Sequence, residues 1–308
     1  MPLKNIIAID LGGTNLKLAL LNSRLNIKAR SILNTRKFLN KAGLIRAISD
    51  SIETIISGNN LRKSDISGVG LGLPGPIDAK KGIVHFFPNI PGWREVNLKR
   101  ILQEKTGLPV FLDNDAKLMA LAEYKKGAAR GSLNAICLTL GTGVGGGLII
   151  NGEIFRGSTN ATGEIGHLPI NEDGPKCNCG GKACLEAYIG NNAILKEAKN
   201  KFRKRVTLEE LSYLANKGDK LATNIWKKVG ERLGIALSAV VNLLNPDCIV
   251  IGGGVANSGK ILFQEVKKTI LKRAMNVQAK HVKVRPAVLG SDAGLIGAAM
   301  LVKEGVGR

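Results

Sequence analysis

Three cysteines and a histidine near the middle of this 308-residue sequence have the types and spacing of metal ligands. Cys177, Cys179 and Cys184 fall within a stretch of eight residues, and His167 precedes the first of them by ten. One imidazole and three thiolates form a ligand set of structural zinc sites, which are closed to catalysis. Three free surface thiols, or a redox pair at Cys177 and Cys179, are the alternatives. A disulfide framework belongs to small secreted chains, so a metal site is the favoured interpretation.

An acidic run could supply a catalytic base. Asp113-Asn114-Asp115 follows the apolar strand candidate 109–112 and precedes a helix predicted from about Ala116. Phosphoryl transfer needs positioning, charge neutralisation and a base beside the attacking hydroxyl, and little covalent chemistry from the protein. We predict Asp115 as that base. Asp113 or Asn114 could instead cap the helix, and the two roles can be filled together by different residues.

Glycine-rich turns follow three of the predicted strands and could approach phosphate groups. Glycine allows close backbone approach, and backbone N–H groups bind phosphate oxygens together with a threonine hydroxyl. The turn at 12–14 follows Asp10, which is placed to hold Mg²⁺. This turn could equally belong to an ordinary hairpin. The turn at 141–147 has five glycines in seven residues, which is more than a hairpin needs. A third turn at 252–254 opens toward a helix, where an adenosine could lie against the backbone.

These turns together predict a nucleotide site, and the family resemblance set out below makes that nucleotide ATP. Neither the glycine pattern of Rossmann dinucleotide-binding folds nor that of Walker A phosphate loops is present. The ATP-binding residues are expected to be Asp10, Gly12, Gly13, Thr14, Asn15, Lys17, Gly141, Thr142, Gly143, Gly253 and Gly254.

The elements that must position these residues are predicted as strands alternating with helices. Hairpins are expected at 6–22 and 136–151, and they share a pattern at an offset of 129 residues. A repeat of this size suggests two related α/β halves, although two short hairpins can also match by chance. The alternation indicates an α/β architecture. Further strands are expected at 66–73, 109–112, 248–251 and 282–285, and helices at 41–57, 116–126, 191–244, 258–275 and 292–303.

The bulk composition narrows the class of protein. The chain is 44% hydrophobic, with no apolar run long enough to span a membrane and no signal-peptide pattern, so we expect a cytoplasmic protein without membrane association. The formal net charge of +21 could indicate a nucleic-acid partner. The basic residues are scattered and no aromatic residues interleave with them, so we favour a basic surface without such a partner. Cys137 and Cys248 lie in apolar strand candidates and are expected to be buried.

The motifs together resemble those of the ROK family, whose name stands for repressor, open reading frame and kinase. The resemblance follows the whole chain in order, and it implies the α/β ATPase fold of actin, hexokinase and the heat-shock chaperone ATPases. Two α/β domains would surround a cleft, in a homodimer or higher homo-oligomer. Residues 1–116 with 292–308 would form the smaller domain, and 117–291 the larger one with the zinc loop. The matching motifs are Asp10-Leu11-Gly12-Gly13-Thr14, Gly72-Leu73-Pro74-Gly75-Pro76, Asn114-Asp115-Ala116, 141–147, Gly163-Glu164-Ile165-Gly166-His167, Cys177-Asn178-Cys179-Gly180 and Cys184-Leu185-Glu186.

The resemblance also assigns residues to a sugar. It makes Asp115 the base and gives Asn114 a hydrogen bond to a sugar hydroxyl. Zinc would fix the loop that carries the sugar ligands, with one His167 nitrogen on the metal and the other facing the sugar. Thr162 interrupts the family's usual Ala-Gly-Glu, and Ala183 replaces a usual glycine, so both could reshape the edge of the pocket. The sugar contacts are expected at Gly75, Asn89, Asn114, Asp115, Glu164, His167 and Glu186.

The function implied by the resemblance is ATP-dependent phosphorylation of a hexose at its 6-hydroxyl, with glucose as the first candidate and Mg²⁺ and structural Zn²⁺ as cofactors. N-acetylglucosamine, N-acetylmannosamine and fructose are the other candidate substrates. Two other classes stay open, a sugar-responsive transcriptional regulator and an ATP-binding module without kinase activity. The family's repressors carry an N-terminal DNA-binding extension that this sequence does not show, and Asp115 is present, so we favour the kinase.

Overall fold

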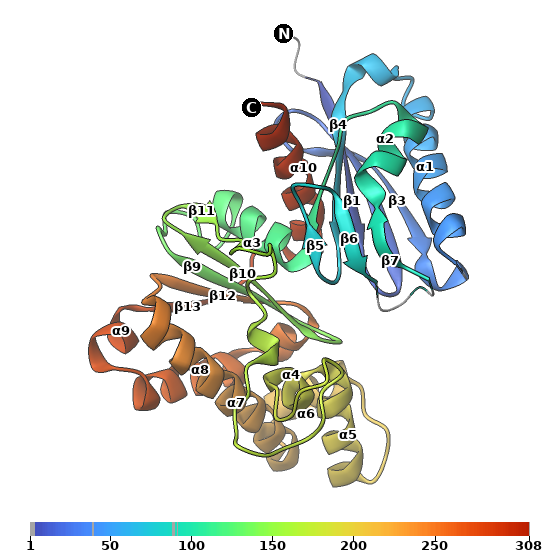
Figure 1. The fold of residues 1–308 in the computed structure, drawn as a ribbon. Coiled ribbons are helices and arrows are strands. Elements are labelled where there is room, and N and C mark those ends of the chain that lie inside the picture. The colour runs from blue at the N-terminus through green and yellow to red at the C-terminus, as the bar shows by residue number, and fades with distance from the viewer. Residues whose placement is uncertain (1–3, 39, 88–89, 91, 308) are drawn as a thin grey trace. The chain divides into compact units, whose positions relative to one another are not determined.

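The computed structural model describes residues 4–38, 40–87, 90 and 92–307, and the chain divides into two units (Figure 1). Unit 1 comprises Met1–Ala122, Arg156–Ala161 and Ser291–Arg308, and unit 2 comprises Glu123–Phe155 and Thr162–Gly290. The chain therefore passes between the units four times. The domain bounds expected from the sequence stay a prediction. They differ from these units in one respect that the sequence did not indicate, since the short segment 156–161 belongs with unit 1.

The main sheet of unit 1 has five strands in the order β3-β2-β1-β4-β8. β1 runs antiparallel to β2 and parallel to β4, and β4 runs parallel to β8. In this register Asp10 lies beside Gly72, and Gly72 lies beside Asp113, so three motifs share one row at the carboxyl ends of parallel strands. The strands are β1 (Asn5–Leu11), β2 (Asn15–Leu21), β3 (Ile27–Asn34), β4 (Ile66–Leu73) and β8 (Val110–Asn114).

Helices cover this sheet and a smaller sheet stands beside it. α1 begins where Asn40 accepts a hydrogen bond from the Gly43 N–H, and it buries a face of isoleucine and leucine. α10 lies so close to β4 that a Cβ on Gly70 would overlap the Ala298 carbonyl. The helices are α1 (Lys41–Ser57), α2 (Leu98–Thr106) and α10 (Ala293–Val306), with short 3-10 turns η1 (Thr35–Lys37), η2 (Lys63–Asp65) and η5 (Gly290–Asp292), and the small sheet contains β5 (Ile77–Asp78), β6 (Ile83–Phe86) and β7 (Arg94–Asn97).

The sheet of unit 2 repeats the topology of the first. Its order is β11-β10-β9-β12-β13, with β9 antiparallel to β10 and parallel to β12. The predicted internal repeat is confirmed at the level of topology. The turns differ by one residue, because Leu11 pairs with Leu16 whereas Leu140 pairs with Val144, so the offset of 129 holds only for the first strand. The strands are β9 (Ala135–Leu140), β10 (Val144–Ile150), β11 (Glu153–Ile154), β12 (Cys248–Gly252) and β13 (Lys283–Pro286).

Helices pack against this sheet in unit 2. The helical run predicted at 191–244 is divided into three helices, because Arg203 adopts a left-handed backbone and Thr207 and Asp219 cap new starts. α7 and α8 approach closely through Gly230 and Gly234. The helices are α4 (Leu185–Ile189), α5 (Asn191–Phe202), α6 (Leu208–Asn216), α7 (Lys220–Leu244), α8 (Lys260–Arg273) and α9 (Asn276–His281), with η3 (Ile165–His167) and η4 (Gly254–Ser258), while α3 (Asp115–Lys126) spans the boundary after Ala122.

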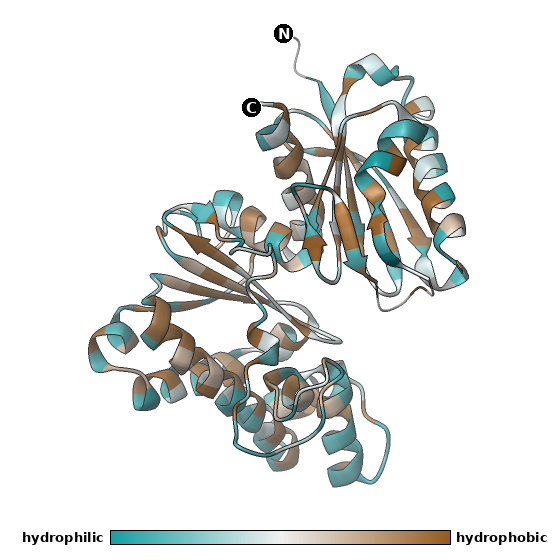
Figure 2. Cartoon of the chain, viewed as in Figure 1, coloured by the Kyte–Doolittle hydropathy of each residue, from teal (hydrophilic) through white to brown (hydrophobic). Residues whose placement is uncertain are grey.

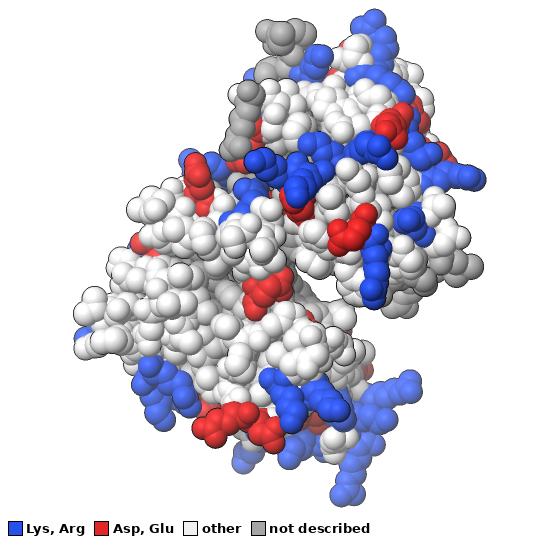
Figure 3. Space-filling model, in the orientation of Figure 1, with Lys and Arg blue, Asp and Glu red and all other residues white. Residues whose placement is uncertain are grey.

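Hydropathy and charge follow the expected division between core and surface. Strands of both five-stranded sheets are predominantly hydrophobic, whereas most of α5 is hydrophilic (Figure 2). Cys137, Cys248 and Trp226 are buried, as predicted for the two thiols. On the face shown in Figure 3, basic side chains are spread over both units and acidic ones lie among them. Within the described part of the chain, no helix has the length and apolarity needed to cross a membrane.

One carboxylate ties the start of β12 to the chain that leads into β9. Asp247 Oδ2 accepts hydrogen bonds from the backbone N–H groups of Leu133 and Asn134, both at 2.8 Å. Its Oδ1 lies 3.2 Å from His281 Nε2. These donors, first the Asn134 N–H, lower the pKa of Asp247 below its ordinary value of 3.8. A carboxyl with a lowered folded-state pKa stabilises the fold above its unfolded pKa and loses that contribution as the pH falls through the folded value.

We therefore expect Asp247→Asn to reduce the free energy of unfolding by about 1 kcal/mol at pH 7, because a half-exposed carboxylate loses charge-assisted hydrogen bonds. Urea denaturation at a series of pH values measures this loss, which should shrink as the pH falls below 3.8. Asp50→Asn, which removes the same charge from an exposed position of α1, is the control and should change stability much less at every pH. A loss that stays constant across the acid range would contradict the electrostatic origin.

Candidate functional site

The first part of the site is the end of β1 in unit 1. Asp10 faces Lys17 across the hairpin, with Lys17 Nζ 3.7 Å from Asp10 Oδ2. Burial raises the pKa of Asp10, and Lys17 opposes this only in part. A Cβ on Gly294, in the first turn of α10, would lie 2.7 Å from Asp10 Cγ, so glycine leaves room beside the carboxylate. A partly buried carboxylate of this kind would gain from a divalent cation, which fits the expected role of Asp10.

The second part is the junction of β8 and α3, also in unit 1. The strand predicted to end at 112 continues through Asp113 and Asn114, and the helix begins at Asp115. Asn114 Oδ1 accepts from the N–H groups of Ala116 at 3.1 Å and Lys117 at 3.3 Å, so Asn114 has the capping role. Its Nδ2 donates to the Gly75 carbonyl at 3.2 Å. The structure thus brings together Gly75, Asn114 and Asp115, three of the predicted sugar contacts.

Gly75 can only be glycine at this position. Its φ is +93°, and a Cβ there would lie 2.5 Å from the Phe86 carbonyl oxygen. The close approach of β6 to the loop after β4 therefore fixes the carbonyl that Asn114 binds. Asn89, another predicted sugar contact, lies outside the described residues.

Asp113 is the fully buried carboxylate of this junction. Its Oδ2 accepts hydrogen bonds from Arg156 Nε at 3.0 Å and Nη2 at 2.8 Å, and its Oδ1 accepts from the Asn114 N–H at 2.8 Å. Sequence reasoning missed Arg156. A buried carboxylate requires a cationic or hydrogen-bonding partner, so a partner could have been expected, but nothing in the sequence selects an arginine 43 residues away.

The four predicted metal ligands come together in unit 2. The ligand atoms of His167, Cys177, Cys179 and Cys184 all lie within 4.8 Å of one another. Cys179 Sγ is 3.7 Å from Cys184 Sγ, and Cys177 Sγ is 3.6 Å from His167 Nδ1. Zinc–sulfur bonds of about 2.3 Å in a tetrahedron place neighbouring ligand atoms about 3.8 Å apart. The donor set and its spacing therefore fit a tetrahedral metal ion.

Backbone pairing holds this cluster in place. The Cys177 N–H donates to the Gly181 carbonyl at 2.8 Å, and the Gly180 N–H donates to the Cys177 carbonyl at 3.0 Å, which closes a tight turn around the thiols. The Leu185 N–H donates to the Leu168 carbonyl at 2.9 Å and joins the two ends of the loop. Burial, followed by the neighbouring thiols, raises the pKa of Cys184 to about 12, so a cation is needed to favour its thiolate.

His167 presents its two ring nitrogens in different directions. Nδ1 lies near Cys177, and Nε2 lies 3.8 Å from Glu164 Oε2. Glu164 and His167 are thus neighbours, on the turn η3 and just before it. Such a ring can hold a metal through one nitrogen while the other side faces a ligand. The expectation that one His167 nitrogen binds zinc while the other faces the sugar stays a prediction.

Glu186 connects the cluster to the glycine-rich turn. It lies in the first turn of α4, directly after Cys184 and Leu185, and its Oε2 accepts from the Val144 N–H at 2.9 Å. A Cβ on Gly143 would lie 2.5 Å from the same oxygen. The Asn191 N–H, at the start of α5, donates to the Gly141 carbonyl at 2.9 Å. Hydrogen bonds from α4 and α5 therefore hold the turn at 141–143 in place.

Packing explains several glycines that the sequence had suggested for phosphate binding. A Cβ on Gly146 would overlap the Gly163 carbonyl, and one on Gly253 would overlap the backbone of Leu140. These glycines allow backbone segments of unit 2 to touch. In contrast, a Cβ on Gly141 or Gly254 would meet no atom within 4 Å. Of the turn glycines for which contacts are described, these two have no packing reason and are the better candidates to face a ligand.

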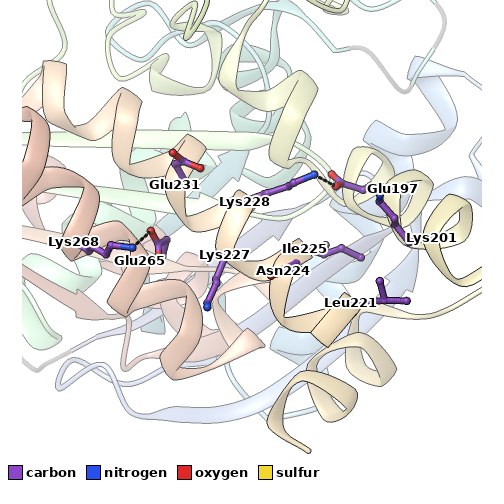
Figure 4. Close-up of a pocket in the computed structure, with 10 residues that line it drawn as sticks. All are labelled: Glu197, Lys201, Leu221, Asn224, Ile225, Lys227, Lys228, Glu231, Glu265 and Lys268. Atoms are coloured by element: carbon purple, nitrogen blue, oxygen red, sulfur yellow. Dashed lines mark hydrogen bonds and ion pairs between the residues drawn. The ribbon is translucent and has the colours of Figure 1, made fainter. Parts of the chain in front are cut away.

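A groove in unit 2 is not part of this constellation. It has a volume of about 370 Å³ and lies among α5, α7 and α8 (Figure 4). Lys228 Nζ lies 3.1 Å from Glu197 Oε1, and Lys268 Nζ lies 3.2 Å from Glu265 Oε1. The walls thus carry paired charges of both signs, and none of the predicted site residues lines the groove.

Comparison with known proteins identifies the family. Residues 6–305 match the ROK family model, and the chain belongs to the ROK family. The glucokinase of Halalkalibacterium halodurans is 37% identical over 97% of this chain and 94% of that protein. The glucokinase of Thermotoga maritima is 34% identical over the full length of both chains. The ROK and α/β predictions are therefore confirmed.

Solved structures agree with this assignment. A ROK family glucokinase from Streptomyces griseus, in complex with glucose and AMPPNP, superposes with a TM-score of 0.84 at 30% identity, covering 97% of this chain and 99% of that one. A ROK hexokinase from Thermus thermophilus gives 0.82 at 33% identity, covering 98% and 99%. The hexokinase-like fold is thereby confirmed. A xylose repressor of Bacillus spizizenii is 34% identical, over 77% of this chain and 61% of the repressor.

The contrast between neighbouring glycines gives a test of the site geometry. We expect Gly253→Ala to destabilise unit 2 by at least about 3 kcal/mol, because its φ is +86° and a Cβ would overlap Leu140. Gly254→Ala is the matched control and should change stability by less than about 0.5 kcal/mol, since its Cβ enters open space. Urea denaturation measures both. Equal losses would mean that packing does not distinguish the two positions.

Proposed function

We propose that this chain is a glucokinase that transfers the γ-phosphoryl group of ATP to the 6-hydroxyl of glucose. The proposal is carried by the sequence identity of 37% and 34% to two glucokinases, over 94% and 100% of their lengths. The geometry supports it, because Gly75, Asn114 and Asp115 lie together in unit 1 and Glu164 lies beside His167 in unit 2. A cytoplasmic location and assembly into a homodimer or higher homo-oligomer remain part of the proposal.

The reaction needs a base at the sugar hydroxyl. Asp115 accepts the proton of the 6-hydroxyl as that oxygen attacks the γ-phosphorus, and the bond from the γ-phosphorus to the bridging oxygen breaks to release ADP. Asn114 binds a sugar hydroxyl and also caps α3, so its orientation is set by the Ala116 and Gly75 backbone. Glu164, His167 and Glu186 hold the remaining ring hydroxyls through paired polar groups, and Asn89 is proposed to contribute with them.

The nucleotide is bound by backbone and by Asp10. The turns that contain Gly12, Gly13 and Thr14 and Gly141, Thr142 and Gly143 offer N–H and hydroxyl donors to phosphate oxygens. Asn15, Lys17, Gly253 and Gly254 complete the proposed set. Asp10 would hold Mg²⁺, which supplies positive charge to the phosphates when bound. Gly141 and Gly254 support this assignment, since no packing contact explains them.

Zinc is proposed to be structural. His167, Cys177, Cys179 and Cys184 would complete a closed tetrahedral shell, which leaves no open position for substrate. Its effect would be to order the loop between η3 and α4, and thereby to hold Glu164 and Glu186, the residues at its two ends. The tetrahedral spacing of the ligand atoms supports this proposal.

A second candidate function is a sugar-responsive regulator. Two observations support this candidate: the 34% identity to a xylose repressor, and the net charge of +21, which would suit binding to DNA. Specific binding of duplex DNA in a gel-shift titration, relieved by a sugar, would support this function. Within the kinase class, N-acetylglucosamine, N-acetylmannosamine and fructose are the competing substrates.

Sugar-dependent ADP release tests the kinase. With Mg·ATP, glucose should drive turnover better than mannose, fructose, N-acetylglucosamine or N-acetylmannosamine. Asp115→Asn should lower kcat by about 10²–10⁴-fold, because it removes a general base and keeps the side-chain shape. Asp50→Asn, on the exposed surface of α1, is the matched control and should leave kcat unchanged. Turnover by Asp115→Asn at more than a tenth of the wild-type rate would exclude Asp115 as the base.

Metal analysis tests the zinc proposal. The purified chain should contain about one zinc per chain by elemental analysis, and Cys179→Ser should lose it. A strong chelator should lower the thermal midpoint and raise KM for glucose, because the loop that carries Glu164 and Glu186 loses its anchor. Cys248→Ala is the control, since that thiol is buried outside the cluster, and it should retain the metal. Zinc that persists in both Cys179→Ser and Cys184→Ser would place it elsewhere.

A further inference from the structure

A short segment of chain forms hydrogen bonds to the residues that precede and follow Asp115 in the sequence. The segment Arg156–Ala161 is separated from Asp115 by about 40 residues of sequence, yet it belongs to the same unit. Near its start, Arg156 makes two hydrogen bonds to the carboxylate of Asp113. Near its end, the Asn160 carbonyl accepts a hydrogen bond from Lys117 Nζ. We refer to residues 156–161 as the strap.

The two residues that bind the strap are equally far from Asp115 in the sequence. Asp113 lies two residues before Asp115, and Lys117 lies two residues after it. Both side chains are buried, with Asp113 0% and Lys117 3% exposed. The strap is itself held to the small sheet, where Asn160 Nδ2 lies 3.5 Å from Asp78 Oδ1. The junction that presents Asp115 is therefore clamped on both sides by one segment.

The Arg156 contact continues to the junction through hydrogen bonds. Asp113 uses Oδ2 for the two Arg156 donors and Oδ1 for the Asn114 N–H at 2.8 Å. Two donors of one rigid guanidinium converge on Oδ2, a planar arrangement that the single ammonium of a lysine does not reproduce. The orientation of Asp113 in turn fixes the backbone of Asn114, whose side chain caps the first turn of α3. Arg156 thus sets the direction in which the helix begins.

Stability alone does not explain a charged pair at this position. Burying the Asp113 carboxylate against a half-buried guanidinium carries a desolvation cost, and well-packed apolar residues of similar size often stabilise a fold as well or better. What the charged pair provides is a defined geometry. A displacement of about 1 Å in a catalytic group can cost on the order of 10²-fold in rate.

We propose that Arg156 is a positioning residue for Asp115, acting through Asp113 and Asn114, with Lys117 as the second tether of the strap. The inference rests on the proposed kinase function and adds to it a residue that belongs to neither the proposed sugar contacts nor the proposed nucleotide contacts. Arg156 leads, within eight residues of sequence, to Glu164, so the same stretch of chain that clamps the base continues into the predicted sugar ligands.

Steady-state kinetics of Arg156 variants test the proposal on the full chain. Arg156→Ala should lower kcat by about 10²-fold per folded molecule, whereas KM for ATP should change less than twofold because the nucleotide contacts are elsewhere. Arg156→Lys keeps the charge and loses the rigid pair of donors that converge on Asp113 Oδ2, so its kcat should be intermediate. Added guanidinium at non-denaturing concentration should partly restore kcat to Arg156→Ala, since the cation can occupy the place beside Asp113.

Arg285→Ala is the matched structural control. Arg285 is half-buried like Arg156, and its Nη1 donates to the Ala128 carbonyl at 2.8 Å in unit 2. Its loss should lower the urea midpoint without lowering kcat of the folded enzyme, and guanidinium should not improve its rate. Amide hydrogen exchange at Lys117 should accelerate in Arg156→Ala and not in Arg285→Ala, because the Lys117 N–H donates to Asn114 Oδ1 and reports that cap.

The outcomes distinguish a positioning role of Arg156 from a purely structural role, and from a failure of the proposed kinase function. A kcat for Arg156→Ala within threefold of wild type overturns the proposal, as does a loss of rate that neither lysine nor guanidinium relieves. If Arg156→Ala does not fold, Arg156→Lys decides, and an unchanged kcat in that variant overturns the proposal. Wild-type enzyme that turns over no sugar contradicts the proposed function itself, whereas an active wild type with an unaffected Arg156→Ala contradicts only the role of Arg156.

Discussion

The parallel alignment of β1, β4 and β8 is the constraint on which the unit 1 site depends. Because parallel strands end at the same edge, Asp10, Gly72 and Asp113 lie in one row, although more than a hundred residues separate the first from the last. Each strand then leads into a different structure: a hairpin turn, the loop with Gly75, and the helix that begins at Asp115. Functional side chains at such strand ends can differ greatly while the sheet beneath them stays the same.

Close backbone contact plays the corresponding part in unit 2. Gly146 meets Gly163, and Gly166 meets Val144, so the loop before the cluster of His167 and the three cysteines lies directly on β10. Glu186 joins the same contact from α4. A side chain at any of these glycines would separate the loop from the strand. The loop that leads to His167 is thus fixed against β10 by backbone packing.

The sequence was sufficient for elements with strong periodic patterns. The helix at 41–57 and the strand at 66–73 have the predicted bounds, since their apolar spacing and flanking turn residues agree. It was insufficient for β5, β6, β7 and α2, which are short and carry few apolar residues. The candidate metal cluster was visible because cysteine spacing is itself informative. The pair of Asp113 and Arg156 was not visible, because tertiary contacts between distant residues leave no local pattern, and packing contacts of glycine look like ligand loops until the neighbouring backbone is known.

The position of α10 has a consequence for how the chain is made. α10 packs on β4 through Gly70 and Ala298 and borders Asp10 through Gly294, yet it is synthesised after all of unit 2. During synthesis from the N-terminus, the face of the first sheet that α10 covers therefore stays uncovered until residues 123–290 have been made. The surroundings of Asp10 are therefore completed last, and the apolar strands of the waiting sheet stay open to misassembly until α10 has been made.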